Sequence, residues 1–129
     1  MRSAKQIIII RKDLKMRRGK EISQGSHASL AVILNTMRKD KNTFKFKIIK
    51  DSPWDLWLNG CFTKICVYCQ SEKELLELYL KAKGAEIPCV LITDAGLTEF
   101  HGVPTNTCIA IGPYWSEEID KITGHLPLL

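Results

Sequence analysis

The sequence has no apolar run long enough to cross a membrane and no segment typical of a secretory leader. None of its hydrophobic stretches approaches the roughly 18 uninterrupted apolar residues that a membrane-spanning helix needs. Residues 1–11 are too short and too charged for a signal peptide. We therefore expect a cytoplasmic protein that does not enter a membrane.

The sequence also lacks the even, regularly spaced cysteines of a disulfide framework. It has five cysteines, at positions 61, 66, 69, 89 and 108, and this odd set suits reduced thiols in the cytosol. Cys66 and Cys69 have the spacing of a metal-binding pair, but residues three apart on a strand point to opposite faces. Because no second pair accompanies them, we expect core thiols, no metal and no disulfide.

Several catalytic signatures are missing. There is no phosphate-binding glycine loop of either common type, which argues against a nucleotide cofactor, so none is expected. There is no nucleophile elbow, and the adjacent Ser26 and His27 cannot face each other on a helix. Ser23 and His27, four residues apart, remain an alternative pair of nucleophile and base.

The residues that are present predict a single α/β domain spanning residues 1–129. The chain is 45% hydrophobic, which is enough for one core but not for two. Strands are expected at 6–10, 62–69, 88–93 and 105–111, the last stopped by Gly112-Pro113. Helices are expected at about 20–37, at 71–83, where Ser71-Glu-Lys-Glu74 forms a capping box, and from a cap at Ser116. This order predicts a mixed four-stranded sheet covered by helices, with residues 39–60 as an irregular connection containing one short helical turn.

Positive charge is concentrated in one short segment. Residues 11–20, RKDLKMRRGK, hold six basic side chains against Asp13 alone and carry a net charge of +5. The other 119 residues hold 13 basic and 13 acidic side chains, which cancel. Such a segment on an otherwise neutral domain is the footprint expected of a phosphate-rich partner, and an ordinary solvated loop is the alternative.

The predicted first helix carries polar residues along one face. Lys20, Gln24 and His27 are spaced i, i+4 and i+7, so they align near the start of the helix. They either line a cleft or form a solvated face with a hydrogen-bonded histidine.

Asp94 stands where the third predicted strand ends, with Thr98 just beyond it. Ligands of open α/β sheets collect outside the carboxyl ends of parallel strands. If the first and third strands run parallel, Asp94 and Lys20 meet at this edge. The alternative is that Asp94 only supplies an Asx-turn to the end of the strand.

Taken together, these segments resemble the second, archaeal and eukaryotic type of peptidyl-tRNA hydrolase, over nearly the whole chain. Several motifs in the right order carry the resemblance: Asp13-Leu-Lys-Met16 with Gly19-Lys20, Gln24 with Ser26-His27-Ala28, Thr93-Asp-Ala-Gly96 with Thr98, Thr107 leading to Ile111-Gly-Pro113, and Ile119-Asp-Lys-Ile-Thr-Gly-His-Leu126. The resemblance implies an α/β fold with a mixed four-stranded sheet and hydrolysis of peptidyl-tRNA without metal or cofactor, and members of the family are frequently homodimers.

Carried over residue by residue, the resemblance implies site residues at Lys20, Gln24, His27, Asp94 and Thr98. The chain departs from the family at Arg17, where glycine is usual, at Gly25, where cysteine is frequent, and at Glu21 and Ser23, where small or apolar residues are usual. Ser23 is therefore not a nucleophile of the family. Within residues 39–60, only Trp57 to Gly60 matches.

We expect Asp94 to orient or deprotonate a water molecule, and Lys20 to stabilise developing negative charge or to hold Asp94 ionised. Gln24, His27 and Thr98 would complete the hydrogen-bond network. Four cations of the basic segment would hold tRNA phosphates, with little sequence preference: Lys12, Lys15, Arg17 and Arg18. The alternative is a non-catalytic RNA-binding or protein-interaction module on the same fold.

Overall fold

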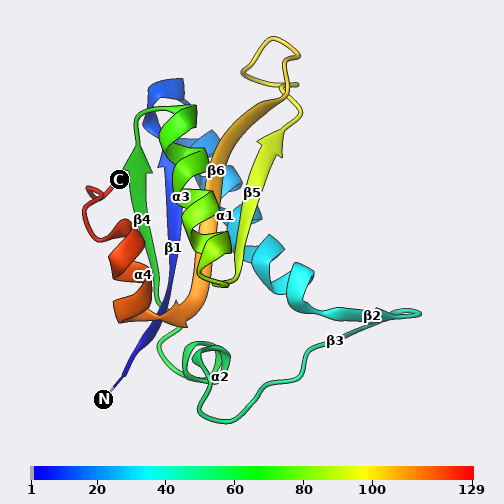
Figure 1. Ribbon diagram of the computed structural model, residues 1–129. Helices are drawn as coiled ribbons and strands as arrows, with labels where there is room; N and C mark the ends of the chain where they lie inside the picture. The colour runs from blue at the N-terminus through cyan, green and yellow to red at the C-terminus, as the bar shows by residue number, and fades with distance from the viewer. Residues whose placement is uncertain (1) are drawn as a thin grey trace.

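A mixed four-stranded sheet forms the centre of the computed structural model, which describes residues 2–129 (Figure 1). Its strands lie in the order β4-β1-β6-β5. Their bounds are β1 Ala4–Arg11, β4 Lys64–Cys69, β5 Cys89–Asp94 and β6 Thr105–Trp115. The predicted fold class is confirmed.

The pairing of the strands determines which loops meet. β1 pairs parallel with β4 and antiparallel with β6, and β5 also pairs antiparallel with β6. β1 and β5 therefore run in the same direction, and their carboxyl ends lie at one edge of the sheet. This is the condition under which Asp94 and Lys20 were expected to meet.

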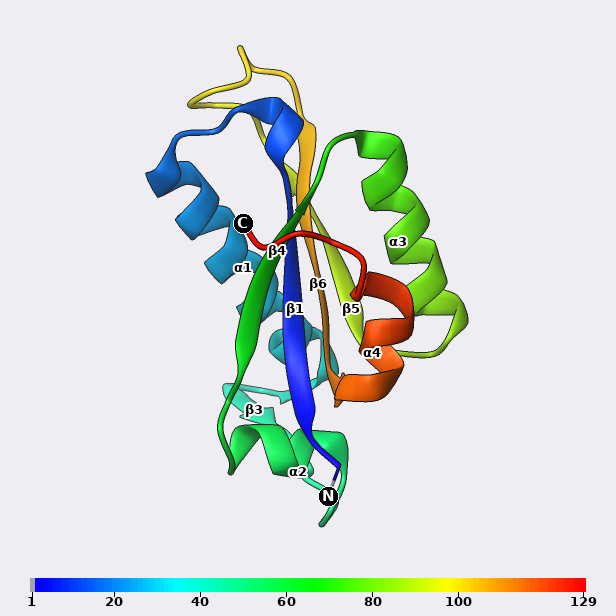
Figure 2. The same cartoon turned by 90° about the vertical axis from the view of Figure 1, so that its left-hand side faces the viewer.

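Helices cover both faces of the sheet. Figure 2 shows α1, Arg18–Thr36, on one face, and α3, Glu72–Gly84, with α4, Ser116–Thr123, on the other. The isoleucines of β1 alternate between the two layers, because successive strand residues point to opposite faces: Ile8 and Ile10 pack in the core under α1, and Ile7 and Ile9 in the core under α3 and α4. This explains why β1 is apolar without interruption.

The small residues of α1 allow close packing on the sheet. A Cβ atom added at Gly25 would already lie 3.5 Å from Cγ2 of Ile8. At α3, the predicted cap at Ser71 is also confirmed, since its hydroxyl accepts a hydrogen bond from the backbone N–H of Glu74 at 3.1 Å.

Two predictions about the end of the fourth strand are wrong. β6 does not stop at Gly112-Pro113 but continues to Trp115, which lies opposite Ala4 of β1. Gly112 adopts a φ of +95°, and β6 has one residue more than β1 between the pairs Lys5–Tyr114 and Ile7–Ile111, so β6 bulges at Gly112-Pro113 and continues to pair. Ser116 does not cap α4, because it is already the first helical residue and its hydroxyl accepts a hydrogen bond from Ser3.

The segment predicted as an irregular connection contains more order than expected. It includes the expected short helix, α2, Pro53–Leu58. It also forms a β-hairpin, with β2 at Arg38–Asp40 and β3 at Thr43–Lys45, which the sequence reasoning missed. Strands of three exposed residues have no buried face, so they show no alternation of polar and apolar residues.

Candidate active site

Lys20 and Asp94 meet at the carboxyl edge of the sheet. Asp94 ends β5, and Lys20 lies in the first turn of α1, which begins at the same edge because the 3-10 turn Lys12–Leu14 reverses the chain after β1. Nζ of Lys20 lies 2.9 Å from Oδ1 of Asp94. Each side chain is only 14% exposed, so the pair is partly shielded from water and remains accessible from one side.

Asp94 also has the structural role that was considered as an alternative. Its Oδ2 accepts a hydrogen bond from the backbone N–H of Gly96 at 2.9 Å, which forms the Asx-turn. Gly96 has a φ of +82°, and a Cβ there would lie 2.3 Å from the carbonyl oxygen of Val103. Only glycine fits at this position, so the turn orients the carboxylate relative to Lys20.

The surroundings of Asp94 keep it ionised. The hydrogen bond from Lys20 is the largest cause that lowers the pKa of this carboxyl group, and the Gly96 N–H, the charge of Lys20 and the amide of Gln24 add to it. Partial burial opposes the shift but is outweighed. A carboxylate with a lowered pKa carries its charge throughout the neutral range.

Lys20 connects Asp94 to Thr98. Its ammonium also donates to Oγ1 of Thr98 at 2.9 Å, so two of its three N–H groups have partners among the described residues. Because the Thr98 hydroxyl accepts this bond, its own proton is available for donation. Thr98 is exposed, and a small molecule in solvent can reach this hydroxyl.

Gln24 joins the same network and is held by a residue that sequence reasoning did not select. Its Nε2 donates to Oδ1 of Asp94 at 3.3 Å, while its Oε1 accepts from the hydroxyl of Thr107 at 2.5 Å. Thr107 is fully buried on β6. The available signal was a hydroxyl residue within an otherwise apolar strand, Thr107 to Ile111, which needs a hydrogen-bond partner when buried.

The structure does not bring His27 to this cluster. It lies seven residues after Lys20, about 10 Å further along the helix, and its side chain is exposed. None of the hydrogen bonds within residues 2–129 involves the His27 side chain. The alternative pair of Ser23 and His27 is not formed either, since the Ser23 hydroxyl donates to the carbonyl oxygen of Lys20.

The basic segment lies at the same edge of the sheet as the Lys20–Asp94 pair. Four of its cations are exposed: Lys12, Lys15, Arg17 and Arg18. Arg17 reaches Glu99 in the loop after β5, with 3.2 Å between Nε and Oε1. Arg11 differs from them, because it is buried and donates to Asp13, to Glu72 and to the carbonyl oxygen of Asn106. Arg11 therefore has a structural role in this segment.

The thiols are not arranged as a metal site. Residues 2–129 contain no group of three or more His, Cys, Asp or Glu side chains able to hold a metal ion. Cys69 is buried, but Cys66 is exposed, so the expectation that both are core thiols is wrong for Cys66. Its side chain lies on the opposite face of the strand from Cys69, as the spacing required. Near the site, burial raises the pKa of Cys108 to about 12, which keeps this thiol neutral and a poor nucleophile.

Among the described helices, none is both long enough and apolar enough to span a lipid bilayer.

Comparison with known proteins identifies the family. The family model described as Peptidyl-tRNA hydrolase PTH2 matches residues 4–129. A peptidyl-tRNA hydrolase of Methanocaldococcus jannaschii is 42% identical over 125 residues, covering 97% of this chain and 99% of that protein. That of Methanothermobacter thermautotrophicus is 44% identical over 125 residues, with the same coverage, and that of Methanopyrus kandleri is 42% identical over 97% of both chains. With its lysine–aspartate pair in the matched region, the chain belongs to the peptidyl-tRNA hydrolase PTH2 family.

Proposed function

We propose that this chain hydrolyses the ester bond of peptidyl-tRNA and that Lys20 and Asp94 are the centre of its active site. The family and its curated members support the reaction. The observation that carries the site assignment is the Lys20–Asp94–Thr98 cluster, because each of its members keeps unused hydrogen-bonding capacity toward solvent.

Asp94 is suited to orient the attacking water. Its Oδ1 accepts two hydrogen bonds, from Lys20 and Gln24, whereas its Oδ2 accepts only the bond from Gly96. A carboxylate oxygen can accept two, so Oδ2 keeps one position for a water molecule. Since its pKa is lowered, Asp94 is a weak base, which favours orientation of the water over removal of its proton before attack.

Lys20 and Thr98 supply donors for the charge that develops during the reaction. The water oxygen bonds to the ester carbonyl carbon, the bond from this carbon to the ribose oxygen breaks, and a proton from the water ends on the ribose oxygen. The carbonyl oxygen carries negative charge at the tetrahedral stage. The remaining N–H of Lys20 and the free hydroxyl proton of Thr98 are the donors nearest to Asp94 that can stabilise it.

Gln24 acts by positioning Asp94, and Thr107 acts by positioning Gln24. The Thr107 hydroxyl donates to Oε1 of Gln24, which leaves the amide nitrogen free to donate to the carboxylate. His27 stays a predicted site residue. From its exposed position on α1, it would contact the substrate away from the reacting bond.

The exposed cations of the basic segment would hold the phosphates near the ester. Contacts to phosphate carry little sequence information, which suits an enzyme that accepts many tRNAs. Because peptidyl-tRNA is produced by translation, we also propose that the protein acts in the cytoplasm.

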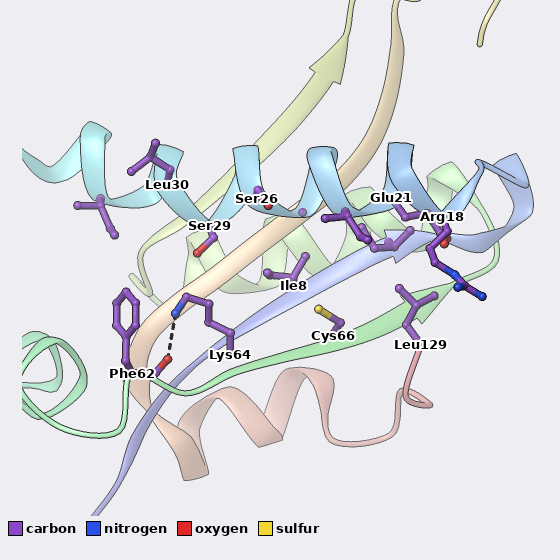
Figure 3. Close-up of a pocket in the computed structure, with 14 residues that line it drawn as sticks. Ile8, Arg18, Glu21, Ser26, Ser29, Leu30, Phe62, Lys64, Cys66 and Leu129 are labelled. Atoms are coloured by element: carbon purple, nitrogen blue, oxygen red, sulfur yellow. Dashed lines mark hydrogen bonds between the residues drawn. The ribbon is translucent and has the colours of Figure 1, made fainter. Parts of the chain in front are cut away.

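We further propose that two copies of the chain associate through the groove between α1 and β4. The groove has a volume of about 780 Å³ and includes the exposed side chains of Ile22, Leu30 and Phe62. In Figure 3, Glu21 and Arg18 lie at one end of it, and Lys64 and Phe62 lie at the other.

Charge complementarity supports a second copy as the occupant. Neither Glu21 nor Lys64 forms an ion pair within residues 2–129. A two-fold axis across the groove, with the two α1 helices antiparallel, would bring Glu21 of each copy to Lys64 of the other and form two equivalent pairs. Sedimentation velocity should detect a dimer that Glu21→Lys weakens and that Glu21→Lys with Lys64→Glu restores. Monomers at all concentrations would contradict the proposal.

A hydrolysis assay tests the function directly. Purified protein should release free tRNA and peptide from peptidyl-tRNA in the presence of a chelator, because no metal or cofactor is assigned to the site. If the protein binds tRNA but leaves the ester intact, it is an RNA-binding module on this fold. Activity lost with the chelator and restored by zinc would show that the site assignment omits a metal.

A further inference from the structure

The β2–β3 hairpin stands apart from the body of the molecule. Figure 1 shows that it extends sideways from the C-terminal end of α1, beyond the sheet and its helices. Every residue of both strands is exposed, so the hairpin contributes nothing to the hydrophobic core. Two short strands that bury nothing are only marginally stable alone, so the hairpin adds little to the stability of the fold.

The hairpin and the residues that follow it are strongly basic. Residues 38–50 carry six basic side chains against Asp40 alone, a net charge of +5. This equals the net charge of the basic segment at 11–20. Outside that segment basic and acidic side chains are equal in number, and this equality conceals a second cationic cluster at residues 38–50. All six cations are exposed: Arg38, Lys39, Lys41, Lys45, Lys47 and Lys50.

These charges repel one another within the protein. The register of the hairpin sets Arg38 directly opposite Lys45, a like-charge pair that destabilises the hairpin. The one carboxylate available, Asp40, lies 3.3 Å from Lys45 and neutralises a single cation. An anionic partner outside this chain would remove the repulsion.

The base of the hairpin is attached firmly to the body. Phe46, just after β3, packs edge-on against Trp54 of α2, with ring centroids 4.8 Å apart. Trp54 in turn contacts Trp57, which is fully buried and donates its indole N–H to the carbonyl oxygen of Thr63. The aromatic contacts hold the cations at a defined place, which a free loop would not do.

Helix α1 connects this second cationic cluster to the candidate active site. Its 19 residues span about 28 Å, with the Lys20–Asp94 pair at one end and the hairpin at the other. Residues 22–37 contain no charged side chain of either sign, so no carboxylate of this stretch separates the two clusters. α3 and α4 on the opposite face carry a net charge of −2. A long polyanion is therefore attracted to the α1 side.

We infer that the β2–β3 hairpin is a second RNA-contact element, which holds the sugar-phosphate backbone of the tRNA far from the ester while Lys20 and Asp94 act on its end. This inference rests on the proposed function. The tRNA carries phosphates along its whole length. It can therefore contact the cations of residues 11–20 and those of residues 38–50 at the same time. An anionic membrane fits less well, because only three apolar side chains of residues 38–50 are prominently exposed, Phe44, Ile48 and Ile49, against six exposed cations.

The test compares two triple variants that remove the same charge. The hairpin variant is Lys39→Gln, Lys41→Gln and Lys47→Gln; the control is Lys73→Gln, Lys81→Gln and Lys83→Gln, on exposed positions of α3. Affinity for deacylated tRNA, which carries no peptide, is measured as a function of salt concentration. The log–log slope should fall by about 2 to 3 in the hairpin variant, close to one unit per lost phosphate contact, and should stay near the wild-type value in the control.

Hydrolysis kinetics locate the effect. On full-length peptidyl-tRNA, the hairpin variant should raise KM and leave kcat unchanged, because its charges act far from the reacting bond. On a peptidyl ester of a short 3′-terminal RNA fragment that cannot reach the hairpin, it should match the wild type. Equal melting temperatures would show that both variants fold.

The two proposals fail in different ways. If the wild type hydrolyses neither substrate, the proposed function is overturned, and the slope of tRNA binding still decides the role of the hairpin. If the hairpin variant keeps the wild-type slope, the inference is overturned. Loss of binding to vesicles of anionic lipid in that variant, with an unchanged slope for tRNA, would assign the hairpin to a membrane instead.

Discussion

Replacing Asp94 with asparagine separates the two roles of this residue. The carboxylate accepts from Lys20 and Gln24 on one oxygen and from the Gly96 N–H on the other. An asparagine keeps the size and one acceptor oxygen, but its NH₂ group must then face at least one of these donors. The variant therefore loses the negative charge, one hydrogen bond and the acceptor position assigned to water.

The structure predicts a large effect on turnover and a modest one on folding. A positioned acid or base contributes about 100-fold to 10,000-fold, and we expect kcat to fall within this range. Loss of a hydrogen bond to a charged group costs about 1 to 2 kcal/mol in a partly exposed pair. For a domain of this size, the melting temperature should fall by about 3 to 10 °C, which leaves the protein folded at 25 °C.

Single-turnover hydrolysis, tRNA binding and thermal unfolding should be measured together. Asp120→Asn is a matched control, because Asp120 also pairs with a lysine, Lys5, but on α4 at the other face of the sheet. Lys20→Met should lower turnover in the same range as Asp94→Asn, and the double variant should be scarcely slower than either. If Asp94→Asn retains more than about a third of the wild-type turnover, a change of well under 1 kcal/mol, Asp94 is only a turn residue.

Three further predictions follow from the same site. Because the pKa of Asp94 is lowered, its pairing with Lys20 stabilises the fold above the ordinary carboxyl pKa, and this stabilisation is lost as the pH falls through the lowered pKa. The wild type should therefore lose more stability than Lys20→Met between about pH 5 and pH 3. Equal losses in urea unfolding measured across this pH range would contradict the assignment. Thr107→Val removes the hydroxyl that orients the Gln24 amide, so kcat should fall about 3-fold to 30-fold with little change in KM, and Thr107→Ser should restore it. If Thr107→Ser restores stability but not kcat, Thr107 acts only in packing. Arg17→Ala with Arg18→Ala should lower the salt slope of tRNA binding by about 1 to 2, and an unchanged slope would show that the RNA lies elsewhere.

Local features of the sequence predicted most of the secondary structure. The β-branched run that ends at Ile10 indicated a strand buried on both faces, and Ser71 indicated the start of a helix, because side-chain spacing and capping act over a few residues. The irregular stretch at 39–60 was only partly predicted, since a hairpin of exposed residues has no hydrophobic pattern. β6 was predicted too short because Gly112 and Pro113 form a bulge within β6, and the pairing with β1 that continues beyond it leaves no local signal in the sequence.

The sequence also predicted only part of the candidate site. Resemblance to the family and the position of Asp94 at the end of a strand were enough to select Lys20, Gln24, Asp94 and Thr98. They were not enough to select Thr107, whose partner Gln24 lies 83 positions earlier in the chain. They also selected His27, which has the right helical face but lies two turns beyond the cluster.

By itself, the sequence determined the fold class, the family, the net charge and the residue types at the edge of the sheet. These depend on composition, short-range spacing and ordered motifs, all of which are local properties of the chain. Only the tertiary structure decided that, of the six basic residues at 11–20, Arg11 is buried and most of the others are exposed. It also decided the partners of Gln24 and the direction in which the second cationic cluster projects. Contacts between residues far apart depend on the register of the sheet and the packing of helices on it, and these are properties of the whole fold.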